Sequence, residues 1–166
     1  MNGILNILKP KGISSHKAVS EVRDILNIPK AGHAGTLDPA ASGVLLVCIG
    51  KATKIVEFLV GMKKHYQGEM ILGLSTDTQD SEGKIIQKRE VKTDIDEKRI
   101  EDIFQKYEGI ISQMPPMFSA AHYKGERLYR LARKGIEVKR KLKKVKIYQL
   151  NLINFYQEEN PIVKLS

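Results

Sequence analysis

The sequence predicts an α+β fold in which a mixed, mainly antiparallel sheet is flanked by helices. Strand-type segments outnumber helical ones, and hairpin turns link several of them. The apolar run over residues 44–49 is continuous, which indicates a strand that is covered on both faces. A chain of 166 residues buries roughly two-thirds of its surface. We therefore expect residues 1–166 to form one domain with its own core.

In the first part of the chain, predicted strands alternate with short helices. Serine and threonine are good N-caps, and proline or glycine ends a helix. The first helix has an apolar face made of Ala18, Val19, Val22, Ile25 and Leu26. The expected elements are a strand over 3–8, a helix capped by Ser14 or Ser15 and ended by Pro29, the strand over 44–49, and a helix capped by Thr53 and stopped at Gly61.

The second part is predicted to contain more strands than helices. Asp80-Ser81-Glu82-Gly83 is typical of a hairpin turn, and Pro115-Pro116 excludes a central strand at that point. Strands are expected over about 64–72 and 84–91. They are followed by a helix that is capped by Thr93 or Asp94, closed by Gly109, and buried through Ile100, Ile103, Phe104 and Tyr107. The remaining expected elements are a strand start at Ile110–Ile111, a turn at Lys124-Gly125, a short helix over 128–133 ended by Gly135, and a last strand over about 145–155.

The most distinctive segment is the loop over residues 32–43, which contains three glycines. Pro39 fixes its own φ angle and biases Asp38 toward an extended conformation. A carboxylate restricted in this way, just before a buried strand, suits a presented and preorganised acid. An Asp-Pro pair in a glycine-rich loop is also a common turn, and residue chemistry alone favours the turn.

Composition narrows the class of protein. Lys and Arg outnumber Asp and Glu by 28 to 19, and the net charge of +9 favours a polyanionic partner. Cys48 is the only cysteine, so we expect a buried core residue and no cysteine-based metal cluster.

The four histidines show no paired ligand spacing, so no metal site is expected. No apolar run has the length of a membrane span and no signal peptide is visible, so we expect a cytoplasmic protein without membrane contact.

Four blocks of the sequence form a recognisable set. They read Lys9-Pro10-x-Gly12-x-Ser14-Ser15; Gly32-His33-Ala34-Gly35-Thr36-Leu37-Asp38-Pro39-x-Ala41-x-Gly43-Val44-Leu45 with Gly50-Lys51-Ala52-Thr53-Lys54; Tyr66 with Gly73-x-Ser75-Thr76-Asp77-Thr78-x-Asp80-x-x-Gly83; and Gln113-x-Pro115-Pro116-x-Phe118-Ser119-Ala120 with Gly125-x-x-x-Tyr129-x-x-Ala132-Arg133-x-Gly135. In this order, from about residue 3 to about residue 150, the blocks resemble the tRNA pseudouridine synthase B family.

The resemblance implies a pseudouridine synthase-like catalytic domain that isomerises the uridine at position 55 in the T-loop of tRNA. The N1–C1′ bond breaks, the uracil turns, and C5 bonds to C1′, with no redox change, so no cofactor is expected. Asp38 is implied as the catalytic carboxylate, acting by attack at the sugar, by proton abstraction from it, or as a partner for developing positive charge. The implied partner is the T-arm stem-loop of tRNA.

The resemblance also implies residues that bind RNA. His33 would contact the RNA loop and help hold the target base out of its stack, with Gly35 and Thr36 in the same motif. Tyr66, in the predicted 64–72 strand, would stack on the extruded uracil. Asp80 would bond to the uracil edge or support an arginine. The residues alone also permit a structural histidine, a core tyrosine and a turn aspartate, respectively.

Residues 139–146 contain the densest basic run of the chain. Together with Lys63, Lys64 and Arg133, this run could follow an RNA backbone and add affinity without sequence preference. A solvated edge that resists pairing with other strands is the alternative. Lys9 and Pro10 are expected to support the 32–43 loop without taking part in chemistry.

Members of the family continue with a strand that carries an active-site arginine and then with a small RNA-binding domain. Because this chain stops at residues 161–166, where that strand would begin, we expect a C-terminally incomplete catalytic domain, acting as a monomer. The catalytic subunit of a guide-RNA-directed complex shares these motifs, but the lack of an extension before Lys9 favours the stand-alone bacterial type. A non-catalytic tRNA-binding or tRNA-folding module is the alternative from another class.

Overall fold

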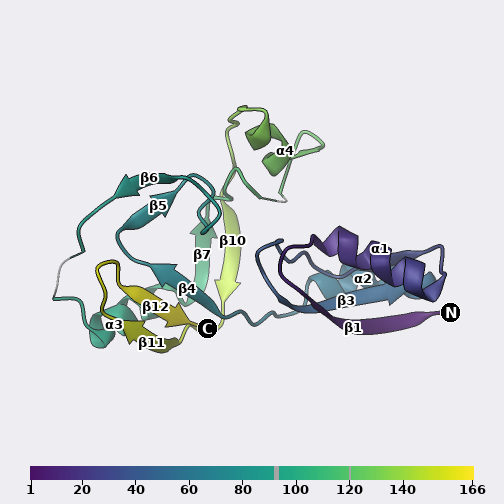
Figure 1. Cartoon of the computed structure of the whole chain (residues 1–166), viewed down its shortest axis with the longest axis horizontal. Coiled ribbons are helices and arrows are strands. Elements are labelled where there is room, and N and C mark those ends of the chain that lie inside the picture. The colour runs from purple at the N-terminus through teal and green to yellow at the C-terminus, as the bar shows by residue number, and fades with distance from the viewer. Residues whose placement is uncertain (92–93, 120) are drawn as a thin grey trace. The chain divides into compact units, whose positions relative to one another are not determined.

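The computed structural model of the chain describes residues 1–91, 94–119 and 121–166. It contains two compact units, Met1–Lys64 and His65–Ser166, each with its own cluster of buried apolar residues. Figure 1 shows a helix laid against a small sheet in both units. The strand pairings in these described residues are antiparallel. The predicted α+β fold with a mainly antiparallel sheet is confirmed.

The first unit is built on a sheet of three strands in the order β1 (Gly3–Lys9), β3 (Gly43–Ile49) and β2 (Ala31–His33). Val47, Cys48 and Ile49 are all buried, although neighbours in a strand point to opposite faces. This end of β3 is therefore covered on both sides, as the apolar run predicts, while Val44 at its other end is exposed. Burial raises the pKa of the Cys48 thiol, which is the expected core residue.

Helix α1 (Ser15–Leu26) lies along this sheet (Figure 1). Ser14 is its N-cap, because the Ser14 hydroxyl accepts a hydrogen bond of 3.1 Å from the Lys17 amide. The helix ends at Asn27, which adopts a left-handed conformation with φ of 49°, two residues before Pro29. The prediction of this helix and its ends is confirmed.

The buried face of α1 carries Ala18 and Val19, which pack against the inward side chains of β3. Val22 and Leu26 extend this contact. The apolar pattern also predicts Ile25 on the buried face, and this is wrong, since the Ile25 side chain is 80% exposed. At 100° per residue, Ile25 lies at the margin of the apolar stripe, beyond the edge that the sheet covers.

The second predicted helix is shorter than expected. Residues Gly50–Ile55 form a 3₁₀ helix, η1, and only Val56–Val60 form α2, which ends at Gly61 as predicted. Thr53 does not cap α2: it lies inside η1, and its hydroxyl donates to the Gly50 carbonyl instead. The position before α2 belongs to Ile55, which has no capping oxygen.

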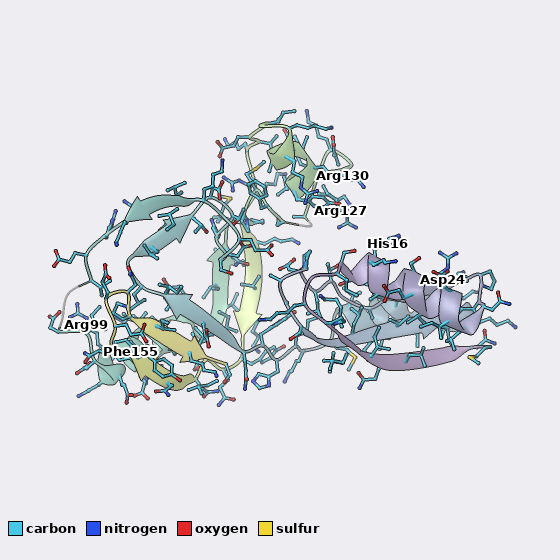
Figure 2. All side chains as sticks on the ribbon, viewed as in Figure 1. His16, Asp24, Arg99, Arg127, Arg130 and Phe155 are labelled. Carbon is cyan, nitrogen blue, oxygen red and sulfur yellow. The ribbon has the colours of Figure 1, made fainter. Side chains whose placement is uncertain are left out.

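The second unit has a three-stranded sheet in the order β11 (Leu152–Tyr156), β12 (Ile162–Leu165) and β4 (Gly68–Ile71). Helix α3 (Glu97–Tyr107) packs on it. Ile100 and Phe104 of α3 meet Val163 of the central strand, and all three are buried. Phe155 of β11, labelled in Figure 2, packs against the same cluster.

Two expectations for α3 are wrong. Ile103 and Tyr107 are exposed, because only the stripe through Ile100 and Phe104 faces the narrow sheet. The N-cap is Asp96, whose carboxylate accepts the Arg99 amide at 2.8 Å. Asp94, predicted as a cap, instead lies 3.5 Å from the Arg99 guanidinium. Thr93, the other predicted cap, lies outside the described residues.

Hairpins make up most of the rest of the second unit. The predicted turn at residues 80–83 joins β5 (Leu74–Thr76) to β6 (Ile85–Lys88). The turn at Lys124 and Gly125, both with positive φ, joins β8 (His122–Tyr123) to β9 (Glu126–Arg127), and α4 (Leu128–Arg133) follows with the predicted bounds.

The predicted last strand over 145–155 is two strands. β10 (Lys143–Ile147) pairs with β7 (Gly109–Gln113), whereas β11 pairs with β12 in the other sheet. Residues 148–151 carry the chain between the two sheets, a break for which the sequence has no proline or glycine. In the described part of the chain, no helix is both long and apolar enough to cross a membrane.

Candidate active site

The loop that carries Asp38 is anchored to the start of α1. The buried Ser15 hydroxyl accepts a hydrogen bond of 2.9 Å from the Leu37 amide and donates one of 2.9 Å to the Leu37 carbonyl. Ser14 and Ser15 were equivalent candidates for the helix cap in the sequence. The structure separates their roles: Ser14 caps the helix, and Ser15 fixes the residue next to Asp38.

A turn follows this anchor. The Asp38 carbonyl accepts a hydrogen bond of 3.1 Å from the Ala41 amide, and the Pro39 carbonyl accepts one of 2.8 Å from the Gly12 amide. Asp38 itself is exposed. The interpretation as a turn is therefore correct, and it does not exclude a presented acid, since the backbone of the turn is held while the carboxylate faces outward.

Lys9 supports the neighbouring turn. Its side chain is fully buried, and its ammonium group donates to the carbonyls of Pro10 and Ile13 at 2.8 and 2.9 Å. The turn that Lys9 holds presents Gly12 to the Asp38 loop. The expectation that the first motif supports this loop is confirmed by these bonds.

His33 lies at the end of β2, at the start of the loop. Its Nδ1 lies 2.5 Å from the carbonyl oxygen of Gly35. A carbonyl oxygen only accepts, so Nδ1 carries the hydrogen in this arrangement. In the neutral ring, Nε2 is then the acceptor and is the atom through which His33 would contact a donor on a ligand.

Gly35 and Lys64 approach each other closely. Gly35 has φ of +112°, and a Cβ atom at this position would lie 3.4 Å from Cε of Lys64. The Lys64 ammonium group donates to the carbonyls of Val60 and Met62 at 2.7 and 3.0 Å, where it complements the end of α2. Lys64 thus lies beside the loop, but its charge is directed to backbone carbonyls. Thr36 is exposed.

Tyr66 belongs to the second unit and precedes β4, so its predicted place within a 64–72 strand is wrong. Its side chain is 58% exposed, which also rules out the core tyrosine. An exposed aromatic ring at the end of a sheet is available for stacking.

Asp80 is a turn residue in the structure. One carboxylate oxygen, Oδ1, accepts the Thr78 hydroxyl at 2.6 Å and the Glu82 amide at 3.0 Å. The Asp80 carbonyl also accepts the Thr76 hydroxyl at 2.7 Å. At Gly83 a Cβ atom would overlap the Thr78 hydroxyl, so this turn is tightly closed. The two bonds to Oδ1 hold the carboxylate in one orientation.

Basic side chains gather on the segment from α4 to β10. Figure 2 shows Arg127, at the end of β9, and Arg130, in α4. Lys143, Lys144 and Lys146 of β10 are exposed, whereas Arg140 is held by the Pro115 carbonyl and by Glu137.

The predicted site residues are divided between the two units. His33, Gly35, Thr36, Asp38 and Lys64 lie in the first, while Tyr66 and Asp80 lie in the second. Residues 23–165 match the family model described as TruB family pseudouridylate synthase (N terminal domain). The chain belongs to this family. The candidate site residues of both units fall within the matched range of the TruB family model.

Curated relatives from several bacteria cover almost the whole TruB family chain. The chain is 50% identical to the tRNA pseudouridine synthase B of Alkaliphilus oremlandii (strain OhILAs) over 159 residues, which are 96% of this chain and 52% of that protein. It is 49% identical to the tRNA pseudouridine synthase B of Geobacillus kaustophilus (strain HTA426) over 154 residues, or 93% of this chain and 54% of that protein. The chain thus spans about half the length of these relatives.

Solved structures support the same assignment. A chain in the crystal structure of a Cbf5–Nop10–Gar1 complex is similar with a TM-score of 0.60 and 28% identity, covering 98% of the TruB family chain and 38% of that one. A chain in the structure of an H/ACA RNP bound to a substrate RNA containing 2′-deoxyuridine is similar with a TM-score of 0.63 and 27% identity. This match covers 98% of the TruB family chain and 37% of that one.

Proposed function

We propose that residues 1–166 belong to the catalytic domain of a tRNA pseudouridine synthase that isomerises uridine 55 in the T-loop. The observation that carries the proposal is the Asp38 loop: an exposed carboxylate on a turn that Ser15 and Gly12 hold at either side. This arrangement suits a group that must meet a substrate in a fixed orientation. The names of the curated relatives supply the substrate, tRNA.

The reaction needs one well-placed carboxylate. Cleavage of the N1–C1′ bond leaves positive charge at C1′, which Asp38 would balance either by bonding to the sugar or by its negative charge. C5 then bonds to C1′, loses its hydrogen as a proton, and N1 gains one. Atoms and electrons balance without an oxidant or reductant, so the proposal includes no cofactor.

The other residues would hold the extruded base. His33 would offer Nε2 to the RNA, because Nδ1 is used by Gly35. Tyr66 would stack on the uracil. Asp80 would use its second carboxylate oxygen, Oδ2, because Oδ1 accepts the hydrogen bonds of its own turn. Gly35 and Thr36 would lie beside the RNA backbone as parts of the same loop. We propose that the chain acts on tRNA as a monomer, located in the cytoplasm.

Tyr66 variants test the stacking role. We expect Tyr66→Leu to lower kcat/KM for a T-arm stem-loop by roughly 5- to 150-fold, since base–aromatic stacking is worth about 1–3 kcal/mol. Tyr66→Phe keeps the ring and should retain more activity. Steady-state kinetics on the unmodified stem-loop would measure both.

The matched control is Tyr107→Leu, which removes another exposed tyrosine from the same unit. It should leave kcat/KM unchanged. Equal losses in Tyr66→Phe and Tyr66→Leu would show that stacking is not sufficient and that the hydroxyl takes part.

The basic run makes a separate prediction about salt. If Lys141, Lys143 and Lys144 contact phosphates, replacing all three by Ala should reduce the slope of log affinity against log salt by roughly 2 to 3. The measurement is stem-loop binding at several salt concentrations.

A control for net charge replaces three exposed lysines on helices, Lys17, Lys98 and Lys106. It changes the charge of the chain equally and should leave the slope much closer to that of the wild-type chain. The same slope in both triple variants would mean that residues 141–144 form only a solvated edge.

Two other functions remain as outcomes of the test. Similarity to chains in the Cbf5–Nop10–Gar1 and H/ACA RNP structures would favour a guide-RNA-directed catalytic subunit. The identity to those chains is 27–28%, however, compared with about 50% to the tRNA pseudouridine synthase B relatives. A tRNA-binding or tRNA-folding module would bind without converting uridine.

The experiment that tests the proposed function maps pseudouridine at every uridine of an unmodified T-arm stem-loop after incubation with the chain. Conversion of the position-55 uridine alone, with no guide RNA, would support the proposal. Conversion only when a guide RNA is added would favour the guided complex, and binding without conversion would favour the folding module.

A further inference from the structure

Ser15 stands out among the buried polar residues. Its side chain is 2% exposed, and its hydroxyl group both donates to and accepts from the backbone of Leu37, 22 residues further along the chain. A hydroxyl group has one hydrogen to donate, and in Ser15 that hydrogen goes to the Leu37 carbonyl. Both backbone groups of the residue before Asp38 are therefore satisfied by one side chain.

Ser15 lies on a helix that is packed against the core. Ser15 begins α1, whose next turn carries Ala18 and Val19 of the core; His16, labelled in Figure 2, marks this end of the helix. The helix cap is supplied by Ser14, so the Ser15 hydroxyl is not needed for capping. Leu37 is thereby tied to a packed helix and not to another loop.

We propose that Ser15 is the positioning residue for Asp38. It fixes the chain on the amino-terminal side of the carboxylate, as the Gly12–Pro39 hydrogen bond does on the other side. This inference rests on the proposed function for its catalytic consequence, because it assigns to Ser15 the orientation of the carboxylate that would meet the sugar.

Ser15→Ala tests the anchor itself. Loss of the hydroxyl leaves the partly buried amide and carbonyl of Leu37 without their partner, so the loop should shift or open. We expect hydrogen exchange to accelerate by about tenfold or more at the Leu37 amide, and also at the Ala41 and Gly12 amides, which close the turn around Asp38. Amides in the centre of β3 should keep their protection.

The second readout is turnover of the unmodified T-arm stem-loop. We expect Ser15→Ala to lower kcat by about 100-fold while KM stays within about threefold, because a misplaced catalytic group costs rate and not RNA affinity. Ser15→Cys replaces the hydroxyl by a somewhat larger thiol that is a weaker donor, and it should restore part of both the protection and kcat.

Ser14→Ala is the matched control. It removes the neighbouring hydroxyl and the helix cap but leaves the Leu37 contacts in place. It should lower the melting temperature of the chain without changing exchange at Ala41 and Gly12, and with little change in kcat. This control separates a loss of stability from a loss of position.

The outcomes are distinct. Faster exchange at Leu37, Ala41 and Gly12 in Ser15→Ala but not in Ser14→Ala, with the fall in kcat, supports the inference. Unchanged exchange at Ala41 and Gly12, or an unchanged kcat in an active enzyme, overturns it. If the wild-type chain binds but does not convert the RNA, the proposed function fails and the catalytic role of Ser15 falls with it, whereas the exchange data still decide whether Ser15 holds the loop.

Discussion

Replacing Asp38 by Asn is expected to abolish uridine isomerisation, with a fall in the single-turnover rate of at least about 10³-fold. Asn has nearly the same size as Asp, so the turn closed by the Ala41 amide should form in both proteins. What is lost is the negative charge that would balance or bond to C1′. Affinity for the stem-loop should change by less than about threefold, because charge on Asp38 is directed to the reacting sugar.

A control for this variant is Asp24→Asn on α1, an exposed aspartate of the same unit that is labelled in Figure 2. It changes the net charge equally and should leave the rate unchanged. If Asp38→Asn retained more than about a tenth of the rate, Asp38 would be a turn residue only, and the chemistry would have to be assigned to another group.

The largest expected effect on stability is at Phe104. Phe104→Ala removes a buried ring from the contact between α3 and the central strand β12, which should cost about 3–5 kcal/mol of unfolding free energy. Denaturant unfolding followed by circular dichroism would measure it. Both Ile100 and Val163 would lose packing partners in this cluster.

Ile103→Ala on the same helix is the comparison. Because Ile103 is 44% exposed, its loss should cost no more than about 1 kcal/mol. Similar costs for the two variants would mean that α3 packs through a different face from the one described. The pair therefore tests the corrected assignment of the core.

The sequence predicts helix α1 and helix α4 well because local signals decide them. Ser14 and Pro29 mark the two ends of α1, and Lys124-Gly125 marks the hairpin before α4. Capping oxygens and positive φ angles act over a few residues, so they can be recognised without knowing the rest of the fold.

The wrong predictions have a different cause. Ile25, Ile103 and Tyr107 occupy helical positions that an apolar pattern marks as buried, but the sheets they face are too narrow to cover them. The break between β10 and β11 depends on which partner strands lie nearby. Pattern alone contains no information on the width of a sheet or on the partner of a strand.

In the candidate site, too, the features set by local signals are predictable from the sequence and those set by distant contacts are not. The exposed Asp38 on its turn follows from the glycines and Pro39 of the loop. The anchor through Ser15 joins residues 22 positions apart and has no local signature beyond a pair of serines. The sequence predicts a strand over 64–72 that includes Tyr66, yet the strand begins only at Gly68.

The most direct test of isomerisation by Asp38 uses a T-arm stem-loop with tritium at C5 of the position-55 uridine only. Isomerisation replaces the C5–H bond by the bond to C1′, so tritium must pass to water. We expect the wild-type chain to release one equivalent of tritium per RNA and Asp38→Asn to release none. Tight binding with no release by the wild-type chain would contradict this expectation.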